Sequence, residues 1–269
     1  MKAAIHTHYG PPNVLRIQDV SPPRVGDHQV LIEVHAVPLT EGDRRLRSAD
    51  FPGINAIAGR LMFGVFRPRR GLPGTNFAGR VIAIGSAVTR FAVGEDVFGS
   101  CLYGACAQQL TVDENSPIAK IPEGFDYDEA AAIPYGAGTA LAFLRDVAKV
   151  QPGERVLIVG AAGGVGRFAV QVARHLGAEV TGVCRGPDVE LVRKLGASTV
   201  IDYQLEDFTD NGESYDVIFD TADGGRFNAC RGSLNKGGRY VSVYLDTRML
   251  VQMLVTSVFG DRKATSSVV

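Results

Sequence analysis

The spacing of apolar and polar positions divides the chain into two parts with different patterns. Before Pro122, short alternating or β-branched segments are separated by turns rich in proline and glycine. This spacing predicts strands at residues 2–7, 15–19, 29–37, 79–84, 96–98 and 107–112. We therefore expect residues 1–122 to form a β-rich, partly rolled antiparallel domain.

Beyond Pro122 the pattern changes to longer apolar runs. A helix is expected to begin at residues 127–133, and a second helix to follow Pro134 and end near Val150. Apolar runs predict strands at residues 156–159, 179–184, 199–202, 215–221, 239–243 and 264–269. Alternation of strands with helices predicts an α/β fold with a parallel, doubly wound sheet for residues 123–269.

A glycine turn lies directly between the strand at 156–159 and the next helical segment. Gly160, Gly163 and Gly166 are three residues apart, with Gly164 between the last two. Residues without a Cβ let backbone N–H groups approach a pyrophosphate, and the start of the helix adds unpaired donors and the positive end of its dipole. The order strand, glycine turn, helix, strand predicts a dinucleotide site, with a purely structural turn as the alternative.

The tip of the second strand bears on which dinucleotide is bound. An NAD site usually has a carboxylate about 20 residues beyond the glycines, whereas a 2′-phosphate requires positive charge. Cys184 and Arg185 stand there, with no acid at the strand tip, and Tyr203 follows the third strand. A guanidinium can bind a phosphate with two hydrogen bonds, so we expect NADP(H) to be preferred. The alternatives are a solvated Arg185 and a half-buried Tyr203.

The segment from Asp43 to Arg70 is less regular. A helix-like start at 43–47 is followed by apolar residues from Ile57 to Phe66 and then by Arg67, Arg69 and Arg70. The apolar part is compatible with a core helix or with a flap over a pocket. Without interleaved aromatic residues and more charge, the arginine cluster is typical of a solvated loop end rather than of a nucleic-acid site.

Composition and charge exclude several classes. The 269 residues are 45% hydrophobic and 21% charged, with a formal net charge of −1, so no long-range attraction to nucleic acid or an anionic membrane is expected. No apolar run approaches the roughly 18 residues of a membrane span, and we expect a cytoplasmic protein. The scattered Cys101, Cys106, Cys184 and Cys230 are expected to be reduced thiols.

Several stretches together carry a family resemblance. They are LRSADFP after Gly42 and Asp43, LPGTNFAGRVIAIG, VGEDVFGS, AAAIPYGAGTAL, GERVLIVGAAGGVG and LGASTVIDY. On these residues the chain resembles the medium-chain dehydrogenase/reductase superfamily, and within it the zinc-free quinone-oxidoreductase-like branch. The resemblance implies a groES-like catalytic domain followed by a Rossmann domain, with the nicotinamide held between them.

The same resemblance bears on metal binding. Zinc-dependent members place a cysteine three residues before the position of Asp43, and Gly-His-Glu where this chain has Gly74, Thr75 and Asn76. Thr40, Thr75 and Asn76 lack the thiolate and imidazole ligands of catalytic zinc, and no lobe of four close cysteines is present. We therefore expect no metal site.

Further site residues are implied by the resemblance alone. Thr139 is expected against the nicotinamide, Thr40 to Asp43 beside the cofactor, and the backbone of Val243 and Tyr244 at its carboxamide. Structural alternatives are helix N-caps for Thr139 and Asp43 and sheet core for Val243. Predicted cofactor contacts are Thr40, Asp43, Thr139, Ala162, Gly163, Gly164, Val165, Gly166, Cys184, Arg185, Tyr203, Ala222, Val243 and Tyr244, and predicted catalytic residues are Asp43, Thr139 and Tyr135. For the proton donor, Tyr135, Tyr103, Asp43 and water all remain open.

Two features depart from the family pattern. Many relatives place a lysine near the 2′-phosphate where this chain has Asp188, so Arg185 would carry that contact almost alone. Relatives also continue past the sixth strand, so the sequence ending at Val269 is expected to be a fragment or to leave the cleft without one wall.

The expected function is hydride transfer from NADPH to a quinone or an α,β-unsaturated carbonyl without zinc. Alternatives are an NADPH-binding sensor or interaction protein without turnover, and an alcohol dehydrogenase-like activity. A homodimer formed through the last strand of the sheet is a further hypothesis.

Overall fold

The computed structural model describes residues 1–51, 55–222 and 226–267. These residues form two compact units, one made of 1–51 and 55–135 and the other containing the described residues from Gly136 onward. The division lies inside helix α3 (Tyr127–Leu141). The domain boundary predicted after Pro122 follows the change in sequence pattern and stays a prediction.

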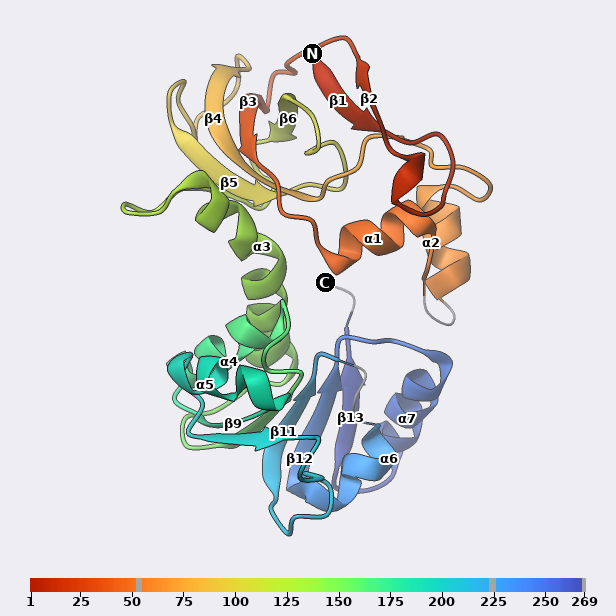
Figure 1. The fold of residues 1–269 in the computed structure, drawn as a ribbon, viewed down its shortest axis with the longest axis vertical. Helices are drawn as coiled ribbons and strands as arrows, with labels where there is room; N and C mark the ends of the chain where they lie inside the picture. Colours follow the sequence, from red (N-terminus) through yellow and green to blue (C-terminus); the bar gives the residue numbers. More distant parts are fainter. Residues whose placement is uncertain (52–54, 223–225, 268–269) are drawn as a thin grey trace. The chain divides into compact units, whose positions relative to one another are not determined.

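The first unit is built from antiparallel strands (Figure 1). A two-stranded sheet pairs β1 with β2, and a five-stranded sheet has the order β6-β3-β4-β5-β7. The bounds are β1 Lys2–Ile5, β2 Arg16–Asp19, β3 Gln29–Ala36, β4 Asn76–Ile84, β5 Asp96–Ser100, β6 Gln109–Asp113 and β7 Ile118–Lys120. All six strands predicted before Pro122 are present, and β7 was missed because it is short and mostly exposed.

Alternate residues of these strands form the core of the first unit. Val30 and Ile32 of β3 pack with Phe77 and Val81 of β4 and with Val97 of β5. The helices of this unit are the 3₁₀ turn η1 Pro12–Val14, α1 Glu41–Ser48 and α2 Asn55–Phe63. They lie in the connections rather than in the sheet core.

The structure of helix α2 excludes the core-helix alternative for the apolar residues before Arg70. Ile57, Leu61 and Met62 are each more than half exposed, so this is not a core helix. Met62 and Phe63 instead line a pocket, as described below.

The second unit contains a six-stranded parallel sheet in the order β10-β9-β8-β11-β12-β13. Its strands are β8 Arg155–Val159, β9 Glu179–Cys184, β10 Thr199–Asp202, β11 Tyr215–Asp220, β12 Leu234–Ser242 and β13 Lys263–Ser266. This order reverses direction at β8, as in a doubly wound Rossmann sheet. The predicted α/β class and parallel sheet are confirmed, while residues 268 and 269 of the sixth predicted strand lie outside the described residues.

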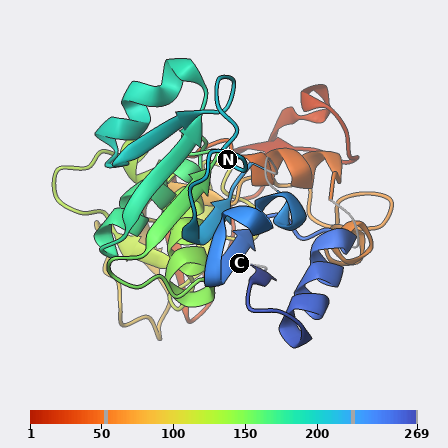
Figure 2. The ribbon, with the colours of Figure 1, turned by 90° about the horizontal axis from the view of Figure 1, so that it is seen from below.

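Helices cover both faces of this sheet. Val156 and Ile158 pack into one core with α4 (Gly166–His175), and Leu157 and Val159 pack into the other with Met249 of α7 (Thr247–Val258). Burial on both faces explains why the strands are continuously apolar. The remaining elements are η2 Ala142–Val147, η3 Gly186–Asp188, α5 Val189–Lys194, α6 Phe227–Cys230 and η4 Arg231–Ser233. Figures 1 and 2 both show α7 beside β13 at the edge of the sheet.

Two boundary predictions are wrong. The helix expected to end before Pro134 continues through it as α3, because Ala130, Ala131 and Ala140 are buried and their packing offsets the lost hydrogen bond. Strand β12 begins at Leu234 rather than Arg239, since the glycine pair at 237 and 238 hides the strand pattern and the register shifts there.

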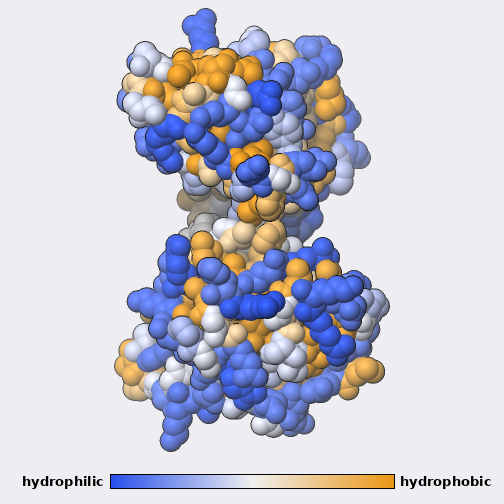
Figure 3. Space-filling model, turned by 90° about the vertical axis from the view of Figure 1, so that its left-hand side faces the viewer, coloured by the Kyte–Doolittle hydropathy of each residue, from blue (hydrophilic) through white to orange (hydrophobic). Residues whose placement is uncertain are grey.

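On the side drawn in Figure 3, hydrophobic residues form separate patches on a mainly hydrophilic surface. Within the described residues, every helix is too short or too polar to cross a lipid bilayer. Cys101, Cys106, Cys184 and Cys230 are free cysteines in this structure.

Candidate functional site

The glycine turn after β8 has the geometry of a phosphate-binding turn. The amides of Gly160 and Ala161 donate to the Val183 carbonyl of β9, at 3.1 and 2.9 Å, and thereby fix the turn against the neighbouring strand. Helix α4 begins at Gly166, and in its first turn the Arg167 amide already donates to the Gly163 carbonyl at 3.0 Å. Among the described residues, the amides of Gly164 and Val165 have no acceptor. A cluster of free donors therefore sits at the positive end of α4.

Each glycine of the turn has a different reason to lack a side chain. Gly160 has a φ of +80°, and a Cβ there would approach Ala222 Cβ to 2.6 Å. A Cβ on Gly166 would lie 2.1 Å from the Gly160 carbonyl oxygen, so close backbone packing excludes it. A Cβ on Gly164 would meet no atom within 4 Å, so this exposed position faces open space. The turn thus combines a tight backbone with an open face that fits a dinucleotide pyrophosphate.

A carboxylate lies beside the tip of β9, and its pairing with Arg185 was not expected from the sequence. Arg185 pairs with Asp188 at 3.2 Å, so its guanidinium is not unopposed. Burial, together with the charges of Asp188 and Asp202, raises the pKa of the Cys184 thiol. The correction has a simple cause, because η3 turns the chain back and brings Asp188 beside the strand tip.

Tyr203 lies at the same tip, because its amide donates to the Cys184 carbonyl at 3.2 Å. Its side chain is 55% exposed and the Cys184 side chain is buried, so Cys184 offers a ligand its backbone only. The structure therefore brings Cys184, Arg185 and Tyr203 together, as the sequence predicted. Their contacts with a cofactor stay predictions.

The carboxyl ends of β11 and β12 complete this edge of the sheet. The buried carboxylate of Asp220 accepts from the Tyr240 hydroxyl at 2.8 Å and from the Ala222 amide at 3.0 Å. The Val243 amide donates to the Asp220 carbonyl at 3.2 Å, and the Tyr244 amide to Ser242 Oγ at 3.0 Å. Asp220 thus positions the predicted contact segments at Ala222 and at Val243. The sequence signal that could have identified Asp220 is a carboxylate at the end of an apolar strand.

In the first unit, Thr40 and Asp43 form a capping box at the start of α1. Asp43 Oδ2 accepts from the Thr40 amide at 2.9 Å and from its hydroxyl at 2.6 Å, and Asp43 Oδ1 accepts from Thr75 Oγ1 at 3.0 Å. The buried carboxylate is therefore held by three donors. The alternative that Asp43 is the N-cap is wrong, because Thr40 is the N-cap and Asp43, three residues later, is its capping-box partner.

Tyr135 and Thr139 belong to helix α3. A Cβ on Gly42 would lie 3.3 Å from the Tyr135 ring, so that ring packs against the first turn of α1. Thr139 lies near the end of α3, so the N-cap alternative for it is wrong. The roles of Tyr135 and Thr139 in catalysis or cofactor binding stay predictions.

The residues at the family's zinc position do not suit that metal. Thr40 Oγ1 and Thr75 Oγ1 both donate to Asp43, and Asn76 donates to Thr75 Oγ1 at 2.9 Å. Hydroxyl and amide groups bind Zn²⁺ poorly beside thiolate and imidazole. Among the described residues, no group of three or more histidine, cysteine, aspartate or glutamate side chains is arranged to hold a metal ion.

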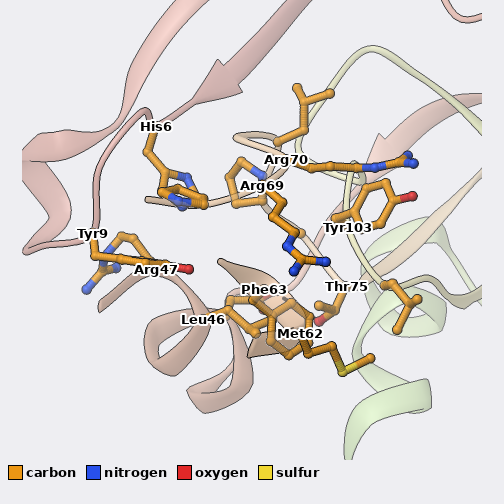
Figure 4. Close-up of a pocket in the computed structure, with 16 residues that line it drawn as sticks. His6, Tyr9, Leu46, Arg47, Met62, Phe63, Arg69, Arg70, Thr75 and Tyr103 are labelled. Carbon is orange, nitrogen blue, oxygen red and sulfur yellow. Dashed lines mark hydrogen bonds between the residues drawn. The ribbon is translucent and has the colours of Figure 1, made fainter. Parts of the chain in front are cut away.

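A pocket of about 350 Å³ adjoins this network within the first unit (Figure 4). Asp43 and Thr75 lie on its wall, together with Tyr103, one of the proton-donor candidates. The sequence interpretation did not identify the other lining residues, among them His6, Tyr9, Arg47 and Arg69. They come from separate connections that only the folded chain brings together.

Comparison with known proteins agrees with this arrangement. Residues 26–125 match the family model of the alcohol dehydrogenase GroES-like domain, and residues 164–266 match the zinc-binding dehydrogenase model. A quinone-oxidoreductase homolog of Spinacia oleracea is 32% identical over 225 residues, covering 77% of this chain and 68% of the relative. The chain belongs to the medium-chain dehydrogenase/reductase superfamily.

Two further members of the superfamily are informative. The quinone oxidoreductase structure from Coxiella burnetii has a TM-score of 0.83 and 30% identity, covering 100% of this chain and 82% of that one. An NADPH-dependent alkenal/one oxidoreductase of Arabidopsis thaliana is 30% identical over 255 residues, 90% of this chain. This chain spans 62% of the length of the Arabidopsis enzyme.

Proposed function

We propose that the protein is an NADPH-dependent reductase that transfers hydride to a quinone or an α,β-unsaturated carbonyl without zinc. The observation that carries the proposal is the glycine turn, whose open face and free amides suit a pyrophosphate. The superfamily membership and the relatives named for quinone and alkenal/one reduction support the acceptor class.

The chain's residues would have three tasks. The turn at 163–166 would hold the pyrophosphate, Arg185 the 2′-phosphate, and the backbone after β12 the carboxamide. When bound, NADPH would supply the hydride. Quinones and enones are already electron-poor, so the protein would mainly align the acceptor and exclude water rather than polarise it with a Lewis acid.

Asp43 is less suited to donate a proton than its position suggests. Its carboxylate oxygens already accept three hydrogen bonds from Thr40 and Thr75, so they are engaged within the first unit. We therefore assign it a positioning role, in which it fixes Thr40 and Thr75 on the pocket wall. Water, Tyr103 and Tyr135 remain as proton sources.

The test is a steady-state assay of NADPH oxidation with a panel of simple quinones and enones. We expect turnover that persists after treatment with a zinc chelator, and a thermal midpoint raised more by NADPH than by NADH. Loss of activity on chelation would favour the alcohol dehydrogenase-like alternative. Tight NADPH binding with no turnover across the panel would favour the sensor alternative.

A homodimer is proposed on a separate observation. Within the described residues, strand β13 is the terminal strand of the six-stranded sheet, an edge at which two copies can pair, although its Ala264 amide already donates to Thr256 Oγ1 of α7 at 3.0 Å. Sedimentation velocity giving only a monomer across micromolar concentrations would contradict this. A cytoplasmic location stays a prediction from the sequence.

A further inference from the structure

The pocket of the first unit has a polar composition that quinone or simple enone reduction does not require. Its walls include the apolar side chains of Leu46, Met62, Phe63 and Leu72. Three arginines, Arg47, Arg69 and Arg70, also line it. Arg69 and Arg70 are exposed and Arg47 is half-buried, so their guanidiniums can be reached by a ligand that enters from solvent.

None of the three arginines has an ion-pair partner among the described residues. Arg70 stacks over the Tyr103 ring at 4.4 Å, and Arg47 donates to the Gly10 carbonyl at 3.2 Å. Figure 4 shows the Arg69 side chain pointing into the space above Phe63 and Met62, whereas Arg70 extends toward Tyr103. Arg69 therefore presents an uncompensated guanidinium to the pocket.

His6 adds a second unusual feature to the same wall. It is 6% exposed, and its Nδ1 atom is buried without a hydrogen-bond partner. Burial and then the nearby charge of Arg47 lower its pKa, which keeps the imidazole neutral. The wall around Arg47 and His6 thus disfavours further positive charge and favours a negative group.

The one carboxylate on the pocket wall does not neutralise this end. Asp43 is already held by the Thr40 amide, the Thr40 hydroxyl and the Thr75 hydroxyl. The pocket wall therefore carries two polar features of different character, a carboxylate whose oxygens already accept hydrogen bonds and the exposed guanidinium of Arg69, which has no ion-pair partner among the described residues. Apolar side chains lie on the walls around both.

We propose that this pocket binds an electrophilic acceptor that also carries a carboxylate on an apolar chain. The carboxylate pairs with Arg69, and the conjugated carbonyl lies toward Asp43 and Thr75. A single planar guanidinium matches a carboxylate through two parallel hydrogen bonds.

This substrate class rests on the proposed function. The carboxylate takes no part in the electron transfer. Hydride adds to the β-carbon of the conjugated carbonyl and a proton adds to the α-carbon, so the C=C bond is reduced while NADPH is oxidised. The acid group serves only to hold the acceptor in one orientation.

The test compares a matched pair of substrates, a medium-chain 4-oxo-2-alkenoic acid and its methyl ester. Wild-type protein is expected to show a higher kcat/KM for the acid. In R69Q the ratio of acid to ester kcat/KM should fall by about 10- to 100-fold, because a charge-assisted pair is lost. R69K keeps the positive charge but not the planar pair of N–H donors. Its acid-to-ester ratio of kcat/KM is expected to lie between those of wild type and R69Q.

The matched control is R67Q. Arg67 lies two residues away in the same exposed connection but does not line this pocket, so its ratio should equal that of wild type. The thermal midpoints of all variants are measured to confirm that they are folded. An equal kcat/KM for acid and ester in wild type, or an unchanged ratio in R69Q, overturns the proposal.

A binding measurement separates this proposal from the proposed function. Isothermal titration uses the saturated 4-oxoalkanoate, which cannot be reduced, and its methyl ester. Binding of the acid that is weakened in R69Q but not in R67Q supports the pocket assignment even if no substrate is turned over. Turnover of simple quinones with no binding of the acid would sustain the reductase and overturn the carboxylate site.

Discussion

The guanidinium of Arg185 pairs with the Asp188 carboxylate at 3.2 Å, three residues further along the chain. The Arg185 side chain is 62% exposed and that of Asp188 is 24% exposed. An exposed pair of this kind contributes little to stability and can exchange one partner for a ligand. The Asp188 carboxylate therefore competes with the 2′-phosphate for the Arg185 guanidinium.

Removing that competitor should strengthen NADPH binding. We expect D188N to lower the Kd for NADPH by up to about 5-fold and to leave the Kd for NADH nearly unchanged. R185Q should weaken NADPH binding by about 10-fold or more. Titration calorimetry with both nucleotides measures these changes.

The control for D188N is D146N, which removes the same charge from the exposed Arg145–Asp146 pair. Its nucleotide affinities should match those of wild type. If R185Q binds NADPH as tightly as wild type does, Arg185 does not contact the phosphate.

Two glycines of the turn should respond differently to alanine. G166A forces a Cβ to within 2.1 Å of the Gly160 carbonyl oxygen and should destabilise the protein by about 1–3 kcal/mol. G164A meets no atom within 4 Å, so stability should change by less than about 0.5 kcal/mol. Its methyl group nevertheless enters the predicted pyrophosphate space, and NADPH binding should weaken about 10-fold or more. Urea unfolding and calorimetry together check both, and normal NADPH affinity in G164A would contradict the assigned position.

The Tyr240 hydroxyl should stabilise the second unit through its bond to Asp220. Burial raises the pKa of Tyr240, so the phenol stays protonated and remains a donor at ordinary pH. Y240F removes one donor from a fully buried carboxylate and should cost about 1.5–3 kcal/mol in unfolding free energy. The exposed Y203F is the control, expected within about 0.5 kcal/mol of wild type. Equal stability of Y240F and Y203F would show that this bond contributes little.

The stabilisation that Glu41 contributes to α1 should depend on pH in the acid range. Hydrogen bonds from Arg44 and Arg45 lower its pKa to about 2. The folded pKa is below the unfolded value, so the stabilisation is full above about pH 4.5 and is lost as the pH falls toward 2. Because the side chain is 45% exposed, E41Q should cost no more than about 1 kcal/mol at pH 7.

Chemical unfolding of wild type and E41Q at a series of pH values measures this difference, which should shrink on acidification. E190Q removes one charge of an exposed pair with Lys194 and serves as the comparison. A difference between E41Q and wild type that stays constant from pH 7 to 2 would contradict the role of Glu41.

Local pattern was sufficient for much of the fold. A strand buried on both faces is apolar at every position, so the run at 156–159 predicts the strand directly. The glycines that follow it predict a turn from local sequence alone. The extent of α3 was not predictable in this way, because packing of distant side chains decides whether a helix continues through Pro134. The start of β12 was misjudged because only Leu234 of its first five residues pairs with β11, and the register shifts before regular pairing resumes at Arg239.

The candidate site divides along the same line. The glycine turn, Cys184, Arg185 and Tyr203 could be found because each follows a predicted strand, and parallel strands end at one edge of their sheet. The ion pair of Arg185 with Asp188 depends on the local 3₁₀ turn η3 between them, and the pocket that joins His6 to Arg69 depends on how distant segments fold together, so neither could be found in this way. The sequence by itself determined the class, the parallel sheet and the turn, all of which are local. Only the tertiary structure decided which charges meet, because side-chain proximity between distant segments is a property of the packed chain.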